Sequence, residues 1–251
     1  MAEHRNHENR PVDGRDKNYR NEALGTGSES GFSTASLTAQ GAGMNFGILV
    51  FDGVEELDFV GPWEVLKIWS KIADGPENCF IVGESQTAIS CARGLSVNPQ
   101  ISFEDCPKLD YLLVPGGQGT RKEVQNRVLL EFVESQARHC QAVLSVCTGA
   151  FILHAAGLLA DKKATTHWAS LARLRALGNV EVMEKRFVRD GNIWTSAGVS
   201  AGIDLMLAFI ASIAGDEVAG QVQFNSEYYP ASTSYGGFEL HPDAPAYLKR
   251  S

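Results

Sequence analysis

The sequence predicts an α/β protein, a three-layer α/β/α sandwich around a mostly parallel sheet. Short apolar runs alternate with longer segments at helical spacing from residue 44 to residue 228. Three of these runs end at chemically distinctive residues: Asp58 follows the first, Gly116 and Gly117 the third, and Cys147 the fourth. Because the carboxyl ends of parallel strands meet at one edge of a sheet, we expect these residues to lie together.

The individual elements follow from periodicity and turn residues. In the first half, we predict strands at 44–51, 80–83 and 109–114, β-rich hairpin material at 87–103 around Arg93-Gly94, and a helix at 59–69 with Pro62 in its first turn. In the second half, we predict a helix at 122–139, the strand and helix on either side of Cys147, a basic helix at 168–177, a hairpin at 180–195 turning at Asp190-Gly191, and helices at 201–213 and 217–228. His154 lies within an apolar helix and is interpreted as a core residue.

Composition divides the chain into three parts. Residues 1–43 hold few apolar side chains and are expected to form a disordered N-terminal extension; residues 44–230 form one domain, and 231–251 a C-terminal tail. No secretory signal or apolar run of about 18 residues is found, so no membrane association is expected. The net charge of −8 argues against a nucleic-acid partner. Five cysteines without a CxxC pair favour a reduced, cytoplasmic protein.

The chain is organised around the apolar strand 142–146, which stops abruptly at Cys147. The small residues Thr148, Gly149 and Ala150 follow, and then an apolar helix. This pattern predicts a nucleophile elbow, in which a sharp strand-to-helix turn presents one side chain. Amides at a helix N-terminus are expected to favour the thiolate over the thiol. The alternative is a buried structural cysteine.

Asp58 is the candidate proton carrier for this thiol. It lies between Leu57 and Phe59, whereas Glu55 and Glu56 are interpreted as part of a solvated acidic loop. A carboxylate beside a thiolate would repel it, so the pair functions only if the two groups share one proton. That requires burial to raise the pKa of Asp58.

Glycine and histidine residues supply the other candidate groups. The backbone amides of Gly117 and Thr148 are candidate donors to a developing negative charge, and Gly116 shares the turn; an ordinary strand-to-loop turn is the alternative. His167 is a candidate to orient the thiol or bind substrate, or else a packed residue at a loop–helix junction. No spacing resembles a metal site, and neither GxGxxG nor a P-loop is present, so no metal or other cofactor is expected.

Five segments together resemble the ThiJ/PfpI superfamily of the class I glutamine amidotransferase-like fold. They are Gly-Val-Glu-Glu-Leu-Asp-Phe-Val-Gly-Pro (53–62), Val-Pro-Gly-Gly-Gln-Gly-Thr (114–120), Ser-Val-Cys-Thr-Gly-Ala (145–150), Ala-Thr-Thr-His-Trp (164–168) and Thr-Ser-Ala-Gly-Val-Ser-Ala-Gly-Ile-Asp (195–204). The resemblance covers residues 44–230 and implies a flavodoxin-like sandwich and a homodimer.

Within that superfamily, the first and third segments are similar to those of isonitrile hydratases and equally to the amidase-like domains of AraC-type transcription regulators. By motif match, the functional residues of the hydratase fall on Asp58, Cys147 and Thr148. The resemblance then implies a small-molecule substrate: an isocyanide hydrated to an N-substituted formamide.

Other functions remain open. The chain is also compatible with a regulatory domain without turnover, a redox sensor that uses Cys147, a glyoxalase or deglycase, and, least of all, a peptidase. Only about 20 residues follow Tyr229, and these include Gly236, Gly237, Pro242 and Pro245, which disfavours an AraC-type DNA-binding module.

Overall fold

The computed structural model describes residues 43–230, 236–237 and 240–248. Contacts divide the chain into two units, residues 1–36 and 37–251, and every described residue belongs to the second. The predicted disordered extension lies outside the described residues apart from Gly43, and the predicted tail is described only in part.

A seven-stranded sheet forms the centre of the domain. Its order is β10-β11-β7-β6-β1-β2-β5, and every neighbouring pair is parallel except β10 with β11. The strands are β1 (Asn45–Leu49), β2 (Asn78–Gly83), β5 (Ile101–Ser102), β6 (Tyr111–Val114), β7 (Ala142–Val146), β10 (Phe187–Asp190) and β11 (Ile193–Ser196). All residues of β6, β7 and β11 are buried, which agrees with the largely apolar sequences of β6 and β7. The predicted mostly parallel sheet is confirmed.

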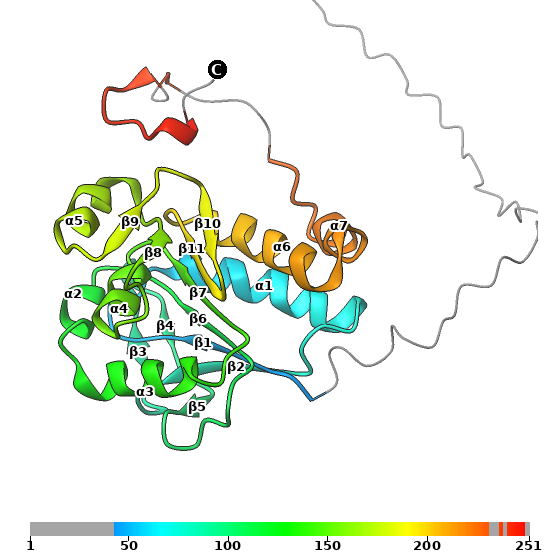
Figure 1. Ribbon diagram of the computed structural model, residues 1–251. Coiled ribbons are helices and arrows are strands. Elements are labelled where there is room, and N and C mark those ends of the chain that lie inside the picture. Colours follow the sequence, from blue (N-terminus) through cyan, green and yellow to red (C-terminus); the bar gives the residue numbers. More distant parts are fainter. Residues whose placement is uncertain (1–42, 231–235, 238–239, 249–251) are drawn as a thin grey trace, which may run out of the picture. The chain divides into compact units, whose positions relative to one another are not determined.

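Helices cover both faces of this sheet (Figure 1). One face carries α1 (Glu56–Ile72), α6 (Ala201–Ala214) and α7 (Asp216–Asn225), and the other carries α2 (Thr120–Glu123), α3 (Arg127–Ala137) and α4 (Gly149–Ala155). Near the end of β11, the short η1 (Trp168–Ser170) leads into α5 (Leu171–Ala176). The three-layer arrangement therefore agrees with the prediction.

Phe209 of α6 is the aromatic centre of the first layer. Its ring centroid lies 5.1 Å from that of Tyr111 on β6 and 6.3 Å from that of Trp69 on α1, in edge-to-face geometry. Trp194 of β11 adds a further contact at 5.8 Å. Such pairs join α1, α6 and the sheet into one core.

Two small sheets flank the main one. The strands β3 (Ile89–Ser90) and β4 (Ser96–Val97) form the hairpin predicted around Arg93-Gly94. The strands β8 (Lys162–Ala164) and β9 (Val180–Val182) pair in parallel. This pairing was not predicted, and it removes residues 180–182 from the predicted 180–195 hairpin, which is formed by β10 and β11 alone. A short 3-10 turn, η3 (Ala246–Leu248), lies in the described part of the tail.

Two predicted helices are wrong in extent. Helix α1 begins at Glu56, so Pro62 lies inside it rather than in its first turn. The predicted helix 122–139 is two helices, because the Asn126 side chain accepts hydrogen bonds from the amides of Val128 and Leu129 and so starts α3 afresh. Asx capping of this kind competes with continuation of a helix.

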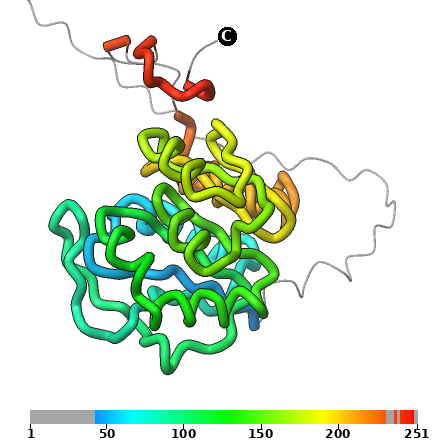
Figure 2. The backbone as a smooth tube through the Cα atoms, turned by 60° about the vertical axis from the view of Figure 1, so that its left-hand side comes forward, coloured from blue at the N-terminus to red at the C-terminus, as the bar shows by residue number. Residues whose placement is uncertain are grey.

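The sheet order brings three strand ends together. Strands β7, β6 and β1 are immediate neighbours, so the residues that follow them emerge side by side at the carboxyl edge. Figure 2 shows the blue β1 segment among the green segments of the middle of the chain. The predicted convergence of the segments that carry Asp58, Gly116 and Cys147 is confirmed. Among the described helices, none has both the length and the apolar character required to cross a bilayer.

Candidate active site

Cys147 occupies a sharp corner between β7 and α4. Its φ is +57°, a left-handed conformation that non-glycine residues rarely adopt, and its amide donates to the carbonyls of Ser196 (3.2 Å) and Ala197 (3.1 Å). The hydroxyl of Thr166 donates to the Cys147 carbonyl at 2.7 Å. A side chain at Gly149 would overlap the Val114 carbonyl, so the small residue after the corner is required sterically. The backbone geometry is that of the predicted elbow.

Asp58 reaches this corner from the first turn of α1. Its side chain is fully buried and is held by two backbone amides: Gly116 N–H donates to Oδ2 (2.9 Å) and Val199 N–H donates to Oδ1 (3.1 Å). The Cys147 thiol lies close enough to this carboxyl group for each of the two groups to shift the pKa of the other. The carboxyl group and the thiol are therefore positioned as a pair.

Val199 is a site residue that sequence reasoning missed. Its motif, 195–204, was recognised, but no role was assigned to Val199 within it. Its φ is +55°, and for a β-branched residue this conformation costs about 1–3 kcal/mol unless the surroundings enforce it. That conformation accompanies the hydrogen bond from its amide to Asp58. A valine in a sequence does not indicate a positive φ, so the conformation of Val199 could not be predicted from its residue type.

Burial dominates the electrostatics of the pair. The net effect raises the pKa of Asp58 to about 7: burial is the largest cause and the nearby Glu55 charge adds to it, whereas the interactions with Gly116, Cys147 and Val199 lower the pKa. Burial also raises the pKa of the Cys147 thiol, and the Asp58 charge adds to this. The amide and hydroxyl of Thr148 lower the pKa of the thiol but do not offset burial. The expected preference for thiolate is therefore wrong for the resting site, because burial beside a carboxylate outweighs the amides at the start of α4.

Thr148 is tied to the loop that follows β6. The amide of Gly117 donates to Thr148 Oγ1 (3.0 Å), and the Thr148 hydroxyl donates to the Gly117 carbonyl (3.2 Å). Thr120 Oγ1 lies 2.8 Å from that carbonyl and 3.1 Å from Thr148 Oγ1. The amide of Gly117 thus donates to Thr148, and the amide of Gly116 donates to Asp58. Both amides position the side chains of candidate catalytic residues and do not point into open space.

Steric contacts explain why glycine stands at both positions. A Cβ at Gly116 would lie 2.7 Å from Thr148 Oγ1 and 2.9 Å from Asp58 Oδ2, and would overlap the Thr148 amide. Gly117 has φ +127°, and a side chain there would overlap Glu55 N and Gly53 O. The Pro-Gly-Gly turn is therefore a close-packing site between β6, α1 and α4.

The acidic segment before Asp58 is not a solvated loop. The Glu55 side chain is 14% exposed and lies 3.2 Å from Arg93 Nε, while Glu56 Oε1 accepts from the Arg93 amide at 2.8 Å. Glu56 Oε2 is buried without a hydrogen-bond partner. The earlier interpretation fails because the β3–β4 hairpin folds over these carboxylates, a long-range contact that local composition does not encode.

His167 lies near the site but is not paired with the thiol in any described hydrogen bond. Its Nδ1 accepts from the Ala169 amide (3.2 Å), which caps η1, and its ring lies against Gly198, where a Cβ would overlap it. Burial lowers its pKa, partly offset by Glu55. The capping role matches the alternative of a packed junction histidine; substrate binding stays a prediction. Among the described residues, no group of three or more His, Cys, Asp or Glu side chains is placed to hold a metal ion.

A family model described as the DJ-1/PfpI family matches residues 45–212, a range that includes Asp58, Cys147, Thr148 and His167. The chain belongs to the DJ-1/PfpI family. The match runs from β1 into α6 and so spans all seven strands of the main sheet.

Named relatives of this DJ-1/PfpI protein include an enzyme and a regulator. An isonitrile hydratase of Pseudomonas putida is 40% identical over 188 residues, which is 75% of this chain and 80% of the hydratase. The HTH-type transcriptional regulator GbdR of Pseudomonas aeruginosa is 33% identical over 130 residues, which is 51% of this chain but only 35% of the regulator. A crystal structure of a ThiJ/PfpI family protein from Pseudomonas syringae superposes with a TM-score of 0.72 at 33% identity and covers 82% of this chain and 84% of its own.

Proposed function

We propose that this DJ-1/PfpI protein hydrates an isocyanide to an N-substituted formamide, with Cys147 as nucleophile and Asp58 as acid and base. The observation that carries the proposal is the burial of the Asp58 carboxyl beside the Cys147 thiol: two backbone amides hold the carboxyl, and its pKa is raised to about 7. The similarity to the hydratase of Pseudomonas putida supports the choice of substrate class.

The proposed reaction begins with the pair holding one proton. The terminal carbon of R–N≡C accepts Sγ while the thiol proton passes through the Asp58 carboxyl to that carbon, giving the thioimidate R–N=CH–S–Cys147. Two backbone amides fix the carboxyl, so the proton is delivered without reorientation of Asp58. Thr148, which the Gly117 backbone holds at the turn, positions the imidate nitrogen and the incoming water.

Hydrolysis of the thioimidate completes the cycle. Asp58, now a carboxylate, accepts a proton from water as the oxygen adds to the carbon, and the C–S bond breaks as Sγ recovers a proton. The released R–N=CH–OH tautomerises to R–NH–CHO. One water is consumed, no external oxidant or reductant is needed, and the enzyme regains its single shared proton.

This mechanism predicts the pH dependence of kcat/KM. Below the pKa of Asp58, about 7, both groups are protonated and the thiol has no acceptor for its proton. The rate should therefore rise as Asp58 ionises and stay high into the alkaline range, since the thiol pKa is raised. A rate that falls through pH 7 would contradict the shared-proton mechanism.

The direct test measures N-cyclohexylformamide formed from cyclohexyl isocyanide by the purified protein. We expect Cys147→Ala to lower kcat/KM by at least about 10³-fold, and Asp58→Asn by at least about 10²-fold. Cys106→Ala, at a half-buried free thiol elsewhere, and Glu64→Gln, on the exposed face of α1, are matched controls that should retain activity.

Other outcomes would favour the competing functions. Undiminished formamide production in either site variant would exclude this mechanism. Lactate from methylglyoxal without hydration would favour a glyoxalase, and oxidation of Cys147 by mild peroxide without any turnover would favour a redox sensor.

Two general properties accompany the proposal. All five cysteines are free thiols, which supports a reducing, cytoplasmic setting. We also propose a homodimer, supported by the exposed apolar residues Leu57 and Val60 on α1 beside Asp58. Sedimentation equilibrium of the purified chain tests this, and a monomer at micromolar concentration would contradict it.

A further inference from the structure

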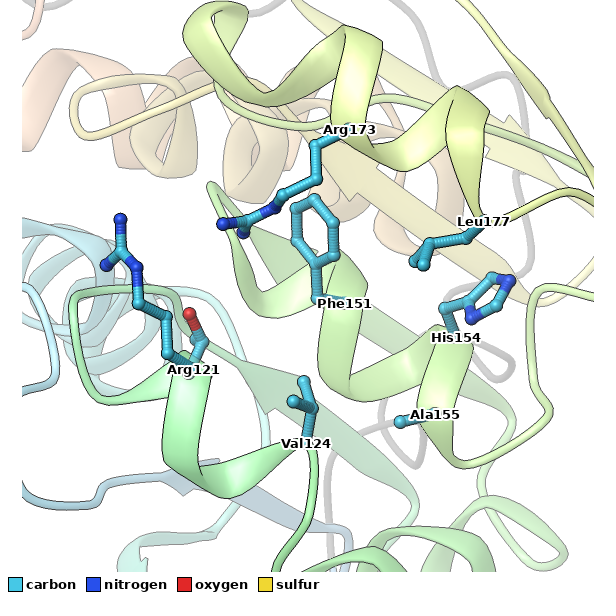
Figure 3. Close-up of a pocket in the computed structure, with 8 residues that line it drawn as sticks. Arg121, Val124, Phe151, His154, Ala155, Arg173 and Leu177 are labelled. Atoms are coloured by element: carbon cyan, nitrogen blue, oxygen red, sulfur yellow. The ribbon is translucent and has the colours of Figure 1, made fainter.

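A cavity of about 330 Å³ lies between α2, α4 and α5 (Figure 3). Neither Asp58 nor Cys147 lines it. Its walls are mainly apolar and come from Val124 after α2, Phe151 and Ala155 on α4, and Leu177 after α5. Its size lies at the lower end of the range for small-molecule sites.

Two arginines reach the same end of this cavity. In Figure 3 the guanidinium groups of Arg121, from α2, and Arg173, from α5, extend toward one end, whereas His154 and Leu177 lie at the other. The guanidinium of Arg173 lies over the Phe151 ring, 4.0 Å from its centroid, a cation–π contact. Arg121 is held by a hydrogen bond from its NH1 to Gln118 Oε1 (2.8 Å).

Within the part of the chain that the structure describes, neither guanidinium forms an ion pair with an acidic side chain. Among the described residues, no Asp or Glu makes a salt bridge with Arg121 or Arg173, although Arg175 on the same α5 helix pairs with Glu184 at 3.0 Å. Burial and the charge of Arg121 together lower the pKa of Arg173, so Arg173 experiences Arg121 as a nearby like charge. Two converging cations over an apolar surface are electrostatically complementary to an anion with an apolar body.

His154 takes part in this cavity rather than in the core. The prediction of a core histidine is wrong: His154 is half-buried, lines the cavity, and its Nε2 lies 3.2 Å from the Gly178 carbonyl. That contact connects the end of α4 to the segment after α5. His154 therefore belongs to the wall of the cavity, at the end opposite the two arginines.

We propose that this cavity binds a small organic carboxylate, with the carboxylate between Arg121 and Arg173 and its aryl or alkyl body against Phe151, Val124 and Leu177. Each guanidinium offers forked N–H donors that match the two carboxylate oxygens. The apolar body displaces water from the cavity walls. This binding site is separate from the Cys147 corner and does not depend on the reaction assigned to that corner.

Isothermal titration calorimetry of the full chain at low ionic strength tests the proposal. The probes are 3-phenylpropionate and its uncharged analogue 3-phenylpropan-1-ol. We expect one saturable site per chain for the carboxylate, with at least about tenfold weaker binding of the alcohol, because the alcohol lacks the charge-assisted hydrogen bonds. Saturable binding of both probes with equal affinity, or no saturation with the carboxylate up to about 10 mM, would overturn the proposal.

Variants locate the site. Arg121→Gln and Arg173→Gln should each weaken 3-phenylpropionate binding by about tenfold, and Ala155→Phe should block it by filling the cavity. Arg175→Gln is the matched control on α5, since this arginine pairs with Glu184 instead, and should bind as the wild type does. Cys147→Ala should also retain binding; a loss in that variant would place the ligand at the active-site corner and contradict the proposal.

Discussion

The corner at Cys147 and the cavity at Arg173 share helix α4 but are opposite in burial, charge and packing. At the corner, Asp58 is fully buried and Cys147 is 7% exposed, and both are negatively ionisable groups whose charged forms burial disfavours. At the cavity, both arginines are exposed and positively charged.

The difference lies in what holds each set of groups. Backbone amides of Gly116 and Val199 fix Asp58, and the strained turn itself fixes Cys147. The cavity is instead formed by side chains that project from three separate helices. The backbone, the least adjustable part of the fold, thus holds the Asp58–Cys147 pair in place. The side chains that line the adjacent cavity can change without altering the geometry of this pair.

The largest expected contrast is in tolerance to added volume. Gly116→Ala places a methyl group against Thr148 and Asp58, and we expect a loss of at least about 3 kcal/mol in the free energy of unfolding or a failure to fold. Ala155→Phe, which extends into the cavity, should change stability by less than about 1 kcal/mol. Urea denaturation followed by circular dichroism measures both.

Gly220→Ala is the control for alanine substitution itself. This glycine lies inside α7 with nothing within 4 Å of a Cβ, so alanine should stabilise the protein by about 0.5–1 kcal/mol. Equal behaviour of Gly116→Ala and Gly220→Ala would show that the corner is not close-packed.

The second contrast is the buried charge of Asp58. Its folded pKa of about 7 lies above the unfolded value of 3.8, so the folded state holds its proton over a range in which the unfolded state releases it. The stability that this provides is complete below about pH 4 and is lost as pH rises toward 7, at up to about 1.4 kcal/mol per pH unit. The wild type should therefore lose stability relative to Asp58→Asn between pH 4 and pH 7, measured by urea denaturation at each pH. Parallel curves would contradict burial as the cause.

Most of the fold could be predicted because its signals are local. The fully buried strands β6 and β7 read as apolar runs, and the carboxyl-edge rule placed Asp58, Gly116 and Cys147 together. The division at Asn126 escaped prediction because the amphipathic pattern continues across it and only a side-chain cap interrupts the helix.

The site was less predictable where it depends on tertiary contacts. Asp58 was distinguished from Glu55 and Glu56 by its apolar neighbours, but the partial burial of those glutamates against the Arg93 hairpin has no local signature. The same is true of the Val199 amide, which meets Asp58 from 141 positions further along the chain. The raised thiol pKa likewise results from burial and from Asp58, neither of which the helix-start pattern reports.

Thr120 allows the comparison to be sharpened, because it lines the cavity while its hydroxyl contacts Gly117 and Thr148. Thr120→Val keeps the shape of the side chain but removes the hydrogen bonds of its hydroxyl. It should lower the free energy of unfolding by about 1 kcal/mol and reduce formamide formation several-fold. Thr120→Ser keeps the hydroxyl and should behave as the wild type. Urea denaturation and the isocyanide assay measure the two effects, and an inactive Thr120→Ser would assign the effect to packing instead.

The smallest expected effect concerns whether charged side chains at the cavity change the pKa of Asp58 at the corner. The Glu55 carboxylate favours the protonated form of Asp58, so Glu55→Gln should lower the Asp58 pKa by a fraction of a unit and move the rise in kcat/KM to lower pH. Arg173→Gln should leave that pKa unchanged, because the groups that shift it are Glu55, Cys147 and the backbone amides rather than the cavity arginines. Carboxyl-carbon NMR titration, with Asp58→Asn to assign the signal, measures the pKa without relying on turnover. A rise of similar size in the Asp58 pKa in Arg173→Gln, the direction expected on losing a nearby positive charge, would mean that the cavity and the corner form one electrostatic site, and that a carboxylate bound between the arginines would tune the acid at the elbow.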